Sequence, residues 1–309
     1  MDDPAVERAV RTAVGDAGSV LVPAVRTAEE VRALLPDADI VVADWSGQLP
    51  LGAAEAAVGG HLQLIQQPGV GISFIDVDSW TEVGVPVANT PGGNAASVAE
   101  WVVAATADLC RSIRWSDAEM RAGRWPQASI LQRECRDLGE RRVGLVGFGD
   151  INRRCGALFQ AFGCDVVYTS RHPDPGSPLR HRPLDDLLAR SDVLVVAVPL
   201  TAQTHRLIAA PELALLPPES LVVNVARGPV VDEAALAAAI RSGSVAGAAL
   251  DVFAREPLES DSALFELDNV LLSPHVAGGS STARRRMYEM TAANVARVCR
   301  DELPLWTLG

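Results

Sequence analysis

The segment that decides the fold is Arg142-Val-Gly-Leu-Val-Gly147-Phe-Gly149-Asp-Ile-Asn152. An apolar run passes into a G-x-G-x-x-N turn and then into a helical stretch, a pattern that predicts a strand, a tight turn and a helix. Gly147 allows the turn, and Gly149 lets the backbone approach a pyrophosphate held by the free N–H groups of Asp150 and Ile151. The segment therefore predicts a dinucleotide site, with a plain strand, turn and helix as the alternative.

Asn152 occupies the third position of this motif, which is usually Gly or Ala because the helix and the strand pack closely there. Two outcomes are open for its side chain. It pushes the helix outward and weakens cofactor binding, or it turns outward at little cost.

Short apolar runs alternate with alanine- and leucine-rich stretches along most of the chain. Several are apolar at every position, as expected of strands covered on both faces, and helical stretches between strands imply parallel pairing with right-handed crossovers. The pattern predicts an α/β fold. The candidate strands are Ser19–Val22, Ile40–Ala43, Leu62–Gln66, Arg142–Val146, Asp165–Tyr168, Val193–Val198, Leu221–Val225, Ala248–Val252 and Val270–Leu272. The proline-rich stretch His172–Pro183 is expected to be a loop.

Two long helices interrupt this alternation. The first opens with a capping-box pattern at Ser97–Glu100 and continues through Trp101–Ile113. The second covers roughly Thr282–Cys299 and must pack on an earlier layer, because only a short segment follows it. Its candidate buried residues are Met287, Met290 and Val298.

Composition limits the possible functions. The chain has 309 residues, which at roughly 150 residues per domain predicts two domains. Its net charge of −12 argues against nucleic-acid or anionic-membrane partners, which require a basic surface. No apolar run reaches the ~18 residues of a membrane span, and residues 1–20 lack a basic start followed by an apolar stretch. We therefore expect a soluble cytoplasmic protein.

The lack of lysine and the spacing of the cysteines limit the possible catalytic and metal sites. All 27 basic residues are arginines, so Schiff-base lysines and the phosphate-loop lysine are impossible. The 5 cysteines are odd in number and show no C-x-x-C spacing, which favours reduced thiols over disulfides or a cysteine–zinc site. No metal site is expected. The candidate proton carriers near neutral pH are His61, His172, His181, His205 and His275.

The residues after the second strand of the motif bear on the choice of cofactor. A ribose 2′-hydroxyl is bound by an acidic residue about 20 positions after the first glycine, whereas a 2′-phosphate is bound by arginine and hydroxyl groups. Ser170 stands 170 − 147 = 23 positions after that glycine and Arg171 follows it, with no carboxylate at the strand end. The pattern favours NADP(H), with NAD(H) possible if Arg171 is only a solvated loop residue.

Three segments at predicted strand ends carry Arg227, Glu256 and His275. In a parallel sheet, ligands bind beyond the carboxyl ends of the strands. A guanidinium can hold a carboxylate by two parallel hydrogen bonds, and a histidine can donate a proton to a carbonyl oxygen as hydride reaches the carbon. A carboxylate beside the imidazole fixes its tautomer and favours its charged form. The three residues are therefore expected to converge, with His275 within hydrogen-bond reach of Glu256 or linked to it by one water.

With these motifs in this order, the chain resembles the D-isomer-specific 2-hydroxyacid dehydrogenase family. The resemblance runs from Gln67-Pro-Gly-Val-Gly71, through Asn94–Glu100 and the glycine turn, to Pro274-His-Val-Ala-Gly278. It implies two Rossmann-like or flavodoxin-like lobes with parallel sheets, the cofactor lobe being inserted into the substrate lobe. Residues 1–92 with 283–309 would form the substrate domain and 93–282 the dinucleotide domain, with a hinge at Thr90-Pro-Gly-Gly93.

The resemblance also implies roles for individual residues and a homodimer paired through the cofactor domain. Arg227, Glu256 and His275 match the catalytic arginine, glutamate and histidine of the family. Formate-oxidising members carry glutamine where Glu256 stands, so this residue favours the hydroxy-acid branch. The substrate-binding residues would be Val70, Gly71, Asn94 and Arg227. Asp251 would hold the nicotinamide amide, and the further cofactor contacts would be Val198, Pro199, Thr204, Ala226 and Gly278.

Several alternatives stay open from the sequence. His275 could be a strand-end histidine bonded to a carbonyl, Arg227 a surface ion pair and Glu256 a solvated loop acid. The expected activity is reduction of a small 2-keto acid such as glyoxylate or hydroxypyruvate. The other functions are a nucleotide-sensing scaffold like the family's corepressors, or a specialised-pathway dehydrogenase for a larger keto acid. Trp45 and Leu49 are candidate residues for covering the bound acid.

Overall fold

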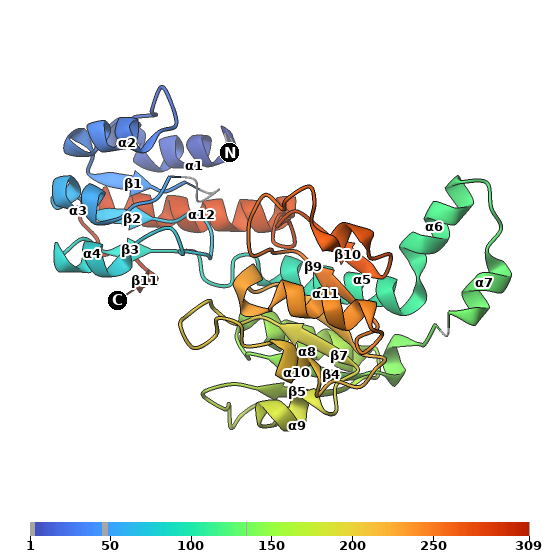
Figure 1. Ribbon diagram of the computed structural model, residues 1–309. Coiled ribbons are helices and arrows are strands. Elements are labelled where there is room, and N and C mark those ends of the chain that lie inside the picture. Colours follow the sequence, from blue (N-terminus) through green and yellow to red (C-terminus); the bar gives the residue numbers. More distant parts are fainter. Residues whose placement is uncertain (1–3, 45–48, 134, 309) are drawn as a thin grey trace. The chain divides into compact units, whose positions relative to one another are not determined.

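The computed structural model describes residues 4–44, 49–133 and 135–308, which fall into two compact units. Unit 1 comprises Met1–Asn94 and Ser280–Gly309, and unit 2 comprises Ala95–Gly279, so unit 2 is inserted into the chain of unit 1 (Figure 1). The boundaries differ by two residues (94 against 92) and three residues (280 against 283) from those expected from the sequence.

Unit 2 is built on a seven-stranded, entirely parallel sheet, which confirms the α/β fold expected from the apolar runs. Its strand order is β10-β9-β8-β7-β4-β5-β6. The strands are β4 (Arg142–Val146), β5 (Asp165–Thr169), β6 (Arg180–His181), β7 (Val193–Val196), β8 (Leu221–Asn224), β9 (Gly247–Leu250) and β10 (Val270–Leu272). The helices are α5 (Ala95–Arg111), α6 (Ile113–Arg121), α7 (Gln127–Gln132), α8 (Asp150–Ala161), α9 (Leu184–Leu188), α10 (Ala210–Leu213) and α11 (Glu233–Arg241).

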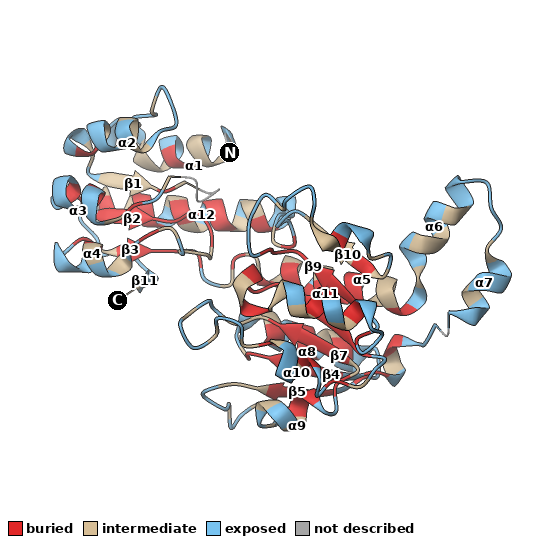
Figure 2. Cartoon of the chain, in the orientation of Figure 1, coloured by how far each residue is buried: buried red, intermediate tan, exposed pale blue. Residues whose placement is uncertain are grey.

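The central strands are apolar throughout because both faces of this sheet are covered. In β7, Val193 and Val195 join the core that α5 and α8 close, while Leu194 and Val196 join the core that α9, α10 and α11 close. Successive strand residues point to opposite faces, so a strand that is buried on both sides needs apolar side chains at every position. Figure 2 shows these strands as the most continuous buried part of unit 2.

The segment between α5 and β4 forms an arm that consists of α6, α7 and the short 3-10 turn Leu138–Glu140. In Figure 1, α6 and α7 lie apart from the sheet of unit 2. No residue of α6 or α7 is buried, and the large apolar side chains of Trp125 and Leu131 are 76% and 79% exposed.

Unit 1 contains a smaller sheet with the order β1-β2-β3-β11. Its first three strands are parallel, but β11 pairs antiparallel with β3. The strands are β1 (Ile40–Val42), β2 (Leu64–Gln66), β3 (Val87–Ala88) and β11 (Thr307–Leu308). The helices are α1 (Pro4–Val14), α2 (Ala28–Leu34), α3 (Ala53–Gly59), α4 (Val77–Glu82) and α12 (Ser281–Val298), with 3-10 turns at Gly15–Ala17 and Leu35–Asp37.

The last helix, α12, packs inside unit 1, as the sequence required. Val298 contacts Leu64 and Ala88 of the sheet, and Met287 packs with residues of α1. Asn294 is fully buried and donates hydrogen bonds to Gln66 Oε1 and to the carbonyl of Leu305, both at 2.8 Å. This amide therefore joins α12 to β2 and to the C-terminal segment.

Four local expectations were wrong or incomplete. Ser19–Val22 is not a strand but an irregular segment before Pro23, with Leu21 and Val22 about half exposed. The expected loop His172–Pro183 contains β6, and β3 and β11 are too short to give a period-2 pattern. Ser97 is not an N-cap, because α5 already begins at Ala95. Met290 is only half-buried, whereas Met287 and Val298 are buried.

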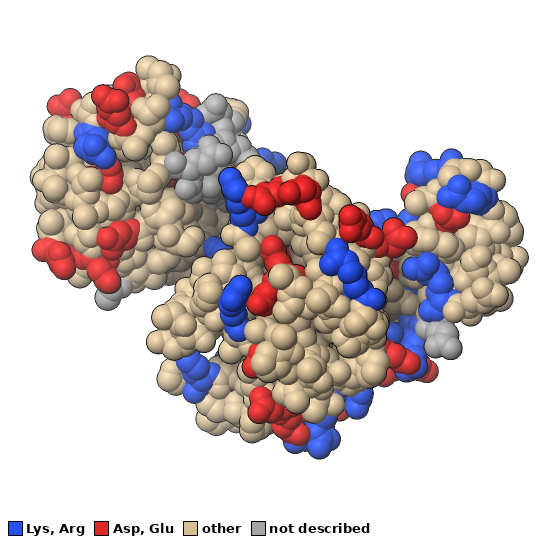
Figure 3. Space-filling view, viewed as in Figure 1, with Lys and Arg blue, Asp and Glu red and all other residues tan. Residues whose placement is uncertain are grey.

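Within the described residues, no helix combines the length and the apolar character needed to cross a membrane. Figure 3 shows acidic and arginine side chains mixed over the visible face.

Candidate active site

Every candidate catalytic and cofactor residue of unit 2 lies at or beyond the carboxyl end of a strand. The glycine turn follows β4, Ser170 and Arg171 follow β5, and Arg227 follows β8. Asp251 follows β9, and His275 follows β10. Because all these strands are parallel, their carboxyl ends share one edge of the sheet, where open α/β sheets bind ligands.

His275 and Glu256 are joined by a hydrogen bond of 2.8 Å between His275 Nδ1 and Glu256 Oε2. Desolvation acts to raise the pKa of Glu256, but hydrogen bonds from His275 and from the N–H of Phe253, together with the charges of His275 and Arg227, hold this pKa below its usual value. An ionised carboxylate only accepts hydrogen bonds, so Nδ1 of His275 carries the proton. The other ring nitrogen, Nε2, is then left for a ligand.

His275 is held in an unusual backbone conformation, with φ at +54°. Its N–H donates to the carbonyl of Asp251 at 2.8 Å. The carboxylate of Asp251 accepts from Ser273 Oγ and from the N–H groups of Val276 at 2.8 Å and Ala277 at 2.9 Å. Desolvation raises the pKa of this buried carboxyl group against these three hydrogen bonds. Asp251 therefore shapes the loop that presents His275, a function that its spacing in the sequence did not reveal.

Arg227 reaches the same region through a close approach of two backbones. A Cβ atom at Gly228 would lie 1.8 Å from the carbonyl carbon of Phe253, so only glycine fits after Arg227. The guanidinium is half-buried and donates from Nη1 to the carbonyl of Ala226 at 2.7 Å. Burial lowers the pKa of Arg227 and the nearby Glu256 carboxylate opposes that effect, while an arginine stays charged at neutral pH. Its Nη2 and Nε groups have no partner among the described residues and can bind an anion.

The glycine turn fits a dinucleotide. Gly147 has a φ of +88°, and a Cβ atom there would lie 2.5 Å from the carbonyl oxygen of Ala197. At Gly149, by contrast, a Cβ atom would meet nothing within 4 Å, so the turn is open on that side. Gly149 is also the N-cap of α8 and offers no side-chain cap, which leaves the first N–H groups of a 12-residue helix for a phosphate.

Asn152 does not turn outward. Its side chain is fully buried, and Nδ2 donates to the carbonyls of Val146 and Gly147, both at 2.9 Å. The amide thus binds the last carbonyl of β4 and the first carbonyl of the turn. It replaces the close packing of a small residue with hydrogen bonds to the turn itself.

We expect Asn152→Ala to lower the free energy of unfolding by about 1–2 kcal/mol, because two buried hydrogen bonds are lost, although the carbonyl of Val146 keeps the N–H of Ala197 as a donor. Urea unfolding followed by circular dichroism measures this change. Arg154→Ala, at an exposed position of the same helix, is the matched control and should change stability by less than about 0.5 kcal/mol. Equal stabilities of the two variants would contradict the contribution of this amide.

The remaining cofactor candidates follow the carboxyl ends of other strands of the same sheet. Ser170 Oγ accepts from the N–H of His172 at 3.3 Å, and Arg171 is exposed. Thr204 Oγ1 donates to the carbonyl of Pro199 at 2.6 Å. Ala226 is buried, whereas Val198 and Gly278 are half-buried.

The candidate substrate residues Val70, Gly71 and Asn94 belong to unit 1 and are half-buried. The carbonyl of Val70 accepts from Asn89 Nδ2 at 2.8 Å, and that of Gly71 accepts from Gln67 Nε2 at 3.1 Å. In the described part of the chain, the N–H groups of Val70 and Gly71 have no partner. Trp45 lies outside the described residues.

Comparison with known proteins identifies the family of the chain. A model of the family "D-isomer specific 2-hydroxyacid dehydrogenase, NAD binding domain" matches residues 103–277. A glyoxylate reductase of Thermococcus onnurineus is 36% identical over 287 residues, 89% of this chain and 83% of that protein. A hydroxypyruvate reductase of Thermotoga maritima is 33% identical over 262 residues, 84% of each chain.

A solved structure extends the similarity to three dimensions. The NADPH-dependent glyoxylate/hydroxypyruvate reductase of Sinorhizobium meliloti, in complex with NADP and malonate, superposes with a TM-score of 0.81 at 31% identity. The match covers 92% of this chain and 88% of that one. These relatives are named as enzymes and thus favour an oxidoreductase over the scaffold function that the sequence left open.

Proposed function

Because the chain belongs to the D-isomer-specific 2-hydroxyacid dehydrogenase family, we propose that it reduces a small 2-keto acid, such as glyoxylate or hydroxypyruvate, to the D-hydroxy acid with NADPH. The chain is an NAD(P)-dependent oxidoreductase, and the proposal concerns its substrate, its preferred cofactor and its site residues. The observation that carries it is the 2.8 Å contact of His275 with Glu256, in the same unit as Arg227 and the glycine turn.

We assign to His275 the role of proton donor. Its Nδ1–H is bound to Glu256, so Nε2 is the nitrogen that faces the substrate carbonyl oxygen. The ionised Glu256 stabilises the doubly protonated imidazole by charge and fixes the orientation of the ring. In the reverse direction, the same Nε2 accepts the proton of the hydroxyl group.

We assign to Arg227 the binding of the substrate carboxylate. Nη1 is engaged by the carbonyl of Ala226, so Nη2 and Nε are the groups that would form two parallel hydrogen bonds to the acid. Half-burial strengthens these charge-assisted contacts, because the local dielectric constant is lower than that of water. Val70, Gly71 and Asn94 are proposed to assist in binding the same substrate.

When bound, a nicotinamide cofactor would supply the hydride. The N–H groups of Asp150 and Ile151 would bind its pyrophosphate at the start of α8, next to the open side of Gly149. Unit 2, which contains the whole segment matched by the NAD binding family model, is proposed as the cofactor domain and unit 1 as the substrate domain.

The experiment that tests the proposal is an NADPH-oxidation screen over 2-keto acids of increasing side-chain size, repeated with NADH. We expect the highest kcat/KM for glyoxylate or hydroxypyruvate with NADPH. Turnover confined to bulky keto acids would replace the substrate assignment by that of a specialised dehydrogenase. Tight NADPH binding without any turnover would contradict the enzymatic role of the three residues.

Replacement of Glu256 should change the pH profile. The charge of His275 and its hydrogen bond help to lower the pKa of Glu256 against desolvation, so Glu256 is ionised at neutral pH and Glu256→Gln removes a charge that stabilises the protonated imidazole. Reduction requires that protonated form, and we therefore expect kcat/KM of the variant to fall at a lower pH than in the wild type. The measurement is kcat/KM for the best keto acid between pH 5 and 9, and an unshifted profile would contradict the coupling of the two side chains.

The cofactor preference should depend on Arg171, which is exposed next to Ser170 at the end of β5. Arg171→Ser removes a charge-assisted contact with the 2′-phosphate, so we expect KM for NADPH to rise about tenfold or more and KM for NADH to stay nearly unchanged. Steady-state kinetics with both cofactors provides the measurement. The matched control, Arg180→Ser, removes an exposed arginine of the adjacent strand and should leave both values unchanged.

We also propose that the protein is a cytosolic homodimer paired through unit 2. The arm carries the exposed apolar side chains of Ile113, Trp125 and Leu131, which a partner chain would cover in the dimer. The five cysteines form no disulfide, as expected in a reducing compartment. Light scattering should give a mass of two chains, and Leu131→Glu should lower it. Cell fractionation tests the location.

A further inference from the structure

The loop between β5 and β6 begins with Ser170 and Arg171, the two residues that the proposed function assigns to the ribose 2′-phosphate. Arg171 is exposed, as are the two residues after it. A charged side chain on an exposed loop loses conformational freedom when it binds a ligand, so its affinity depends on how well the loop is ordered beforehand. We call residues 170–174 the Arg171 loop.

Tyr168, on β5, holds the far end of this loop through its hydroxyl group. The side chain is 1% exposed, and the hydroxyl accepts from the N–H of Asp174 at 2.9 Å and donates to the carbonyl of the same residue at 3.3 Å. Asp174 lies between Pro173 and Pro175, which have no N–H group to donate and whose φ angles are fixed by their rings. The hydroxyl therefore fixes a stretch of backbone that offers few other groups for attachment.

The carboxylate of Asp174 adds a second attachment. It forms an ion pair with Arg153 of α8 and accepts from the N–H of Gly176 at 2.9 Å. These two hydrogen bonds hold the pKa of Asp174 below its usual value, so the ion pair is present at neutral pH. Because both partners are partly exposed, the pair contributes little by itself, and the buried hydroxyl is the main attachment.

The near end of the loop is held from β6. His181 Nε2 donates to the carbonyl of Ser170 at 3.2 Å, since a carbonyl oxygen only accepts. Ser170 Oγ in turn bonds to the backbone of His172. Arg171 thus lies between a residue held by β6 and a residue held by the hydroxyl of Tyr168.

The ring of Tyr168 makes a separate contact, with the glycine turn. It stacks on Phe148, which stands between the two glycines of the turn, at a distance of 3.8 Å between ring centres. The guanidinium of Arg153 also lies over Phe148, 4.4 Å from the ring centre. Tyr168 therefore contacts both proposed phosphate-binding segments, through its ring at the pyrophosphate turn and through its hydroxyl at the Arg171 loop.

We propose that Tyr168 is a positioning residue for cofactor selection. Its hydroxyl orders the Arg171 loop for the 2′-phosphate, while its ring supports the turn that binds either cofactor. The inference rests on the proposed preference for NADPH. A tyrosine that served stability alone would affect both cofactors equally, whereas loss of this hydroxyl acts on the segment that only a 2′-phosphate contacts.

Tyr168→Phe keeps the ring and removes the hydroxyl. Calorimetric titration of the full chain compares adenosine 2′,5′-bisphosphate, which carries the 2′-phosphate, with adenosine 5′-monophosphate, which lacks it. We expect the Kd of the bisphosphate to rise about threefold to tenfold in the variant, as for the loss of one or two hydrogen bonds, and the Kd of the monophosphate to stay unchanged. Tyr288→Phe, at the other tyrosine of the chain, lies in unit 1 and is the matched control, expected to bind both as the wild type does.

Trypsin reports the order of the loop without any ligand, because it cleaves after Arg171. When opening of a loop is fast, the cleavage rate follows the population of the open form. We expect cleavage after Arg171, quantified by peptide mass spectrometry, to be severalfold faster in Tyr168→Phe. Asp174→Asn, which removes the ion pair with Arg153, should accelerate the same cleavage. Cleavage after Arg26, exposed in an irregular segment of unit 1, is the internal reference.

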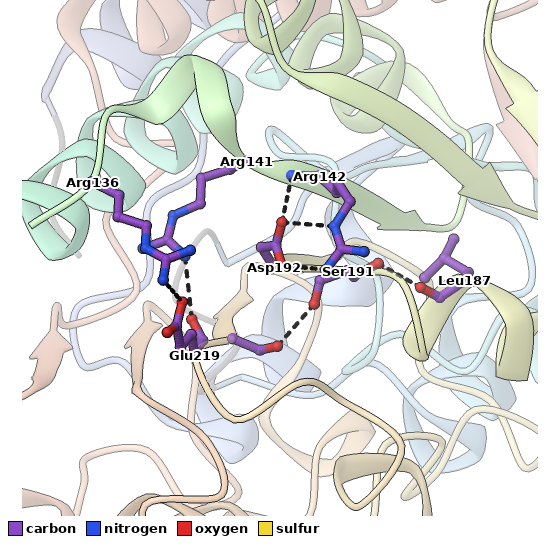
Figure 4. A network of polar contacts seen from close by, with 8 residues as sticks. Arg136, Arg141, Arg142, Leu187, Ser191, Asp192 and Glu219 are labelled. Atoms are coloured by element: carbon purple, nitrogen blue, oxygen red, sulfur yellow. Dashed lines mark hydrogen bonds and ion pairs between the residues drawn. The ribbon is translucent and has the colours of Figure 1, made fainter. Parts of the chain in front are cut away.

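Asp192→Asn is the control for a general loss of stability. Asp192 directly precedes β7, at the opposite end of the same parallel sheet, and its two oxygens bind Arg142 at 2.9 and 2.7 Å (Figure 4). This variant removes an ion pair of the sheet that does not involve the Arg171 loop. We expect a lower thermal midpoint and an unchanged ratio of cleavage after Arg171 to cleavage after Arg26.

Two results would overturn the inference while the preference for NADPH stands. The first is a Tyr168→Phe protein that favours the bisphosphate over the monophosphate as strongly as the wild type does. The second is an unchanged rate of cleavage after Arg171 in that variant. A wild type that binds both nucleotides equally would instead contradict the proposed cofactor preference, and the selective role of Tyr168 with it. No readout requires turnover, so the outcomes are independent of the keto acid that the protein reduces.

Discussion

His275→Ala is expected to lower kcat for reduction of the best keto acid by about 10²–10⁴-fold, the usual contribution of a positioned general acid. Among the described histidines, His275 is the one whose ring is oriented by a hydrogen bond to Glu256. Its removal leaves the carbonyl oxygen to be protonated by water. The dissociation constant of NADPH, measured by fluorescence titration, should change little, since the glycine turn follows a different strand.

The controls for this result separate chemistry from structure. His61→Ala removes an exposed histidine of unit 1 whose Nε2 contacts the carbonyl of Ala38, and it should retain wild-type kcat. Because His275 has a positive φ, the thermal midpoint of His275→Ala is measured alongside. Wild-type turnover in a folded His275→Ala protein would reduce this residue to a strand-end histidine without a catalytic role.

Arg227→Ala should lower kcat/KM for the keto acid by about 10²–10³-fold, mainly through a higher KM. The substrate carboxylate would lose two charge-assisted hydrogen bonds in a half-buried position, where water compensates for them poorly. Steady-state kinetics at saturating NADPH gives this value. The variant also removes the positive charge that helps to keep the pKa of Glu256 low, so part of the loss is expected in kcat.

Arg227→Lys tests the geometry of the contact. Lysine keeps the charge but cannot form the planar pair of hydrogen bonds, so we expect only partial recovery. Arg206→Ala, an exposed arginine that lies 3.6 Å from Asp232, serves as the matched control and should keep the wild-type KM. A normal KM in Arg227→Ala would show that another group binds the carboxylate.

The hydrophobic pattern of the sequence was sufficient to predict the long buried strands but not the two-residue strands. Strands buried on both faces, such as β7, are visible as unbroken apolar runs because each position needs an apolar side chain. The two-residue strands β3, β6 and β11 have no such pattern, since they form where a neighbouring strand offers free backbone groups. Ser19–Val22 has β-branched residues but pairs with no strand of the described residues, and it is irregular.

The site shows the same division. The spacing of Arg227, Glu256 and His275 after buried strands was enough to predict that His275 reaches Glu256, and the structure contains that hydrogen bond. Their catalytic roles stay predictions. Of the two outcomes expected for Asn152, the outward orientation was wrong, and the hydrogen bonds of Asp251 to the His275 loop were not predicted. Both residues act on backbone groups that folding brings near them.

By itself, therefore, the sequence determined the α/β class, the parallel order of strand and helix, the glycine turn and the choice of side chains at the strand ends. These features are local: each depends on the residue type and its neighbours along the chain. Only the tertiary structure decided the φ of His275, the close approach at Gly228 and the burial of the Asn152 amide against the glycine turn. Burial and hydrogen bonding depend on residues far apart in sequence, and their energies arise only once the sheet has brought those residues together.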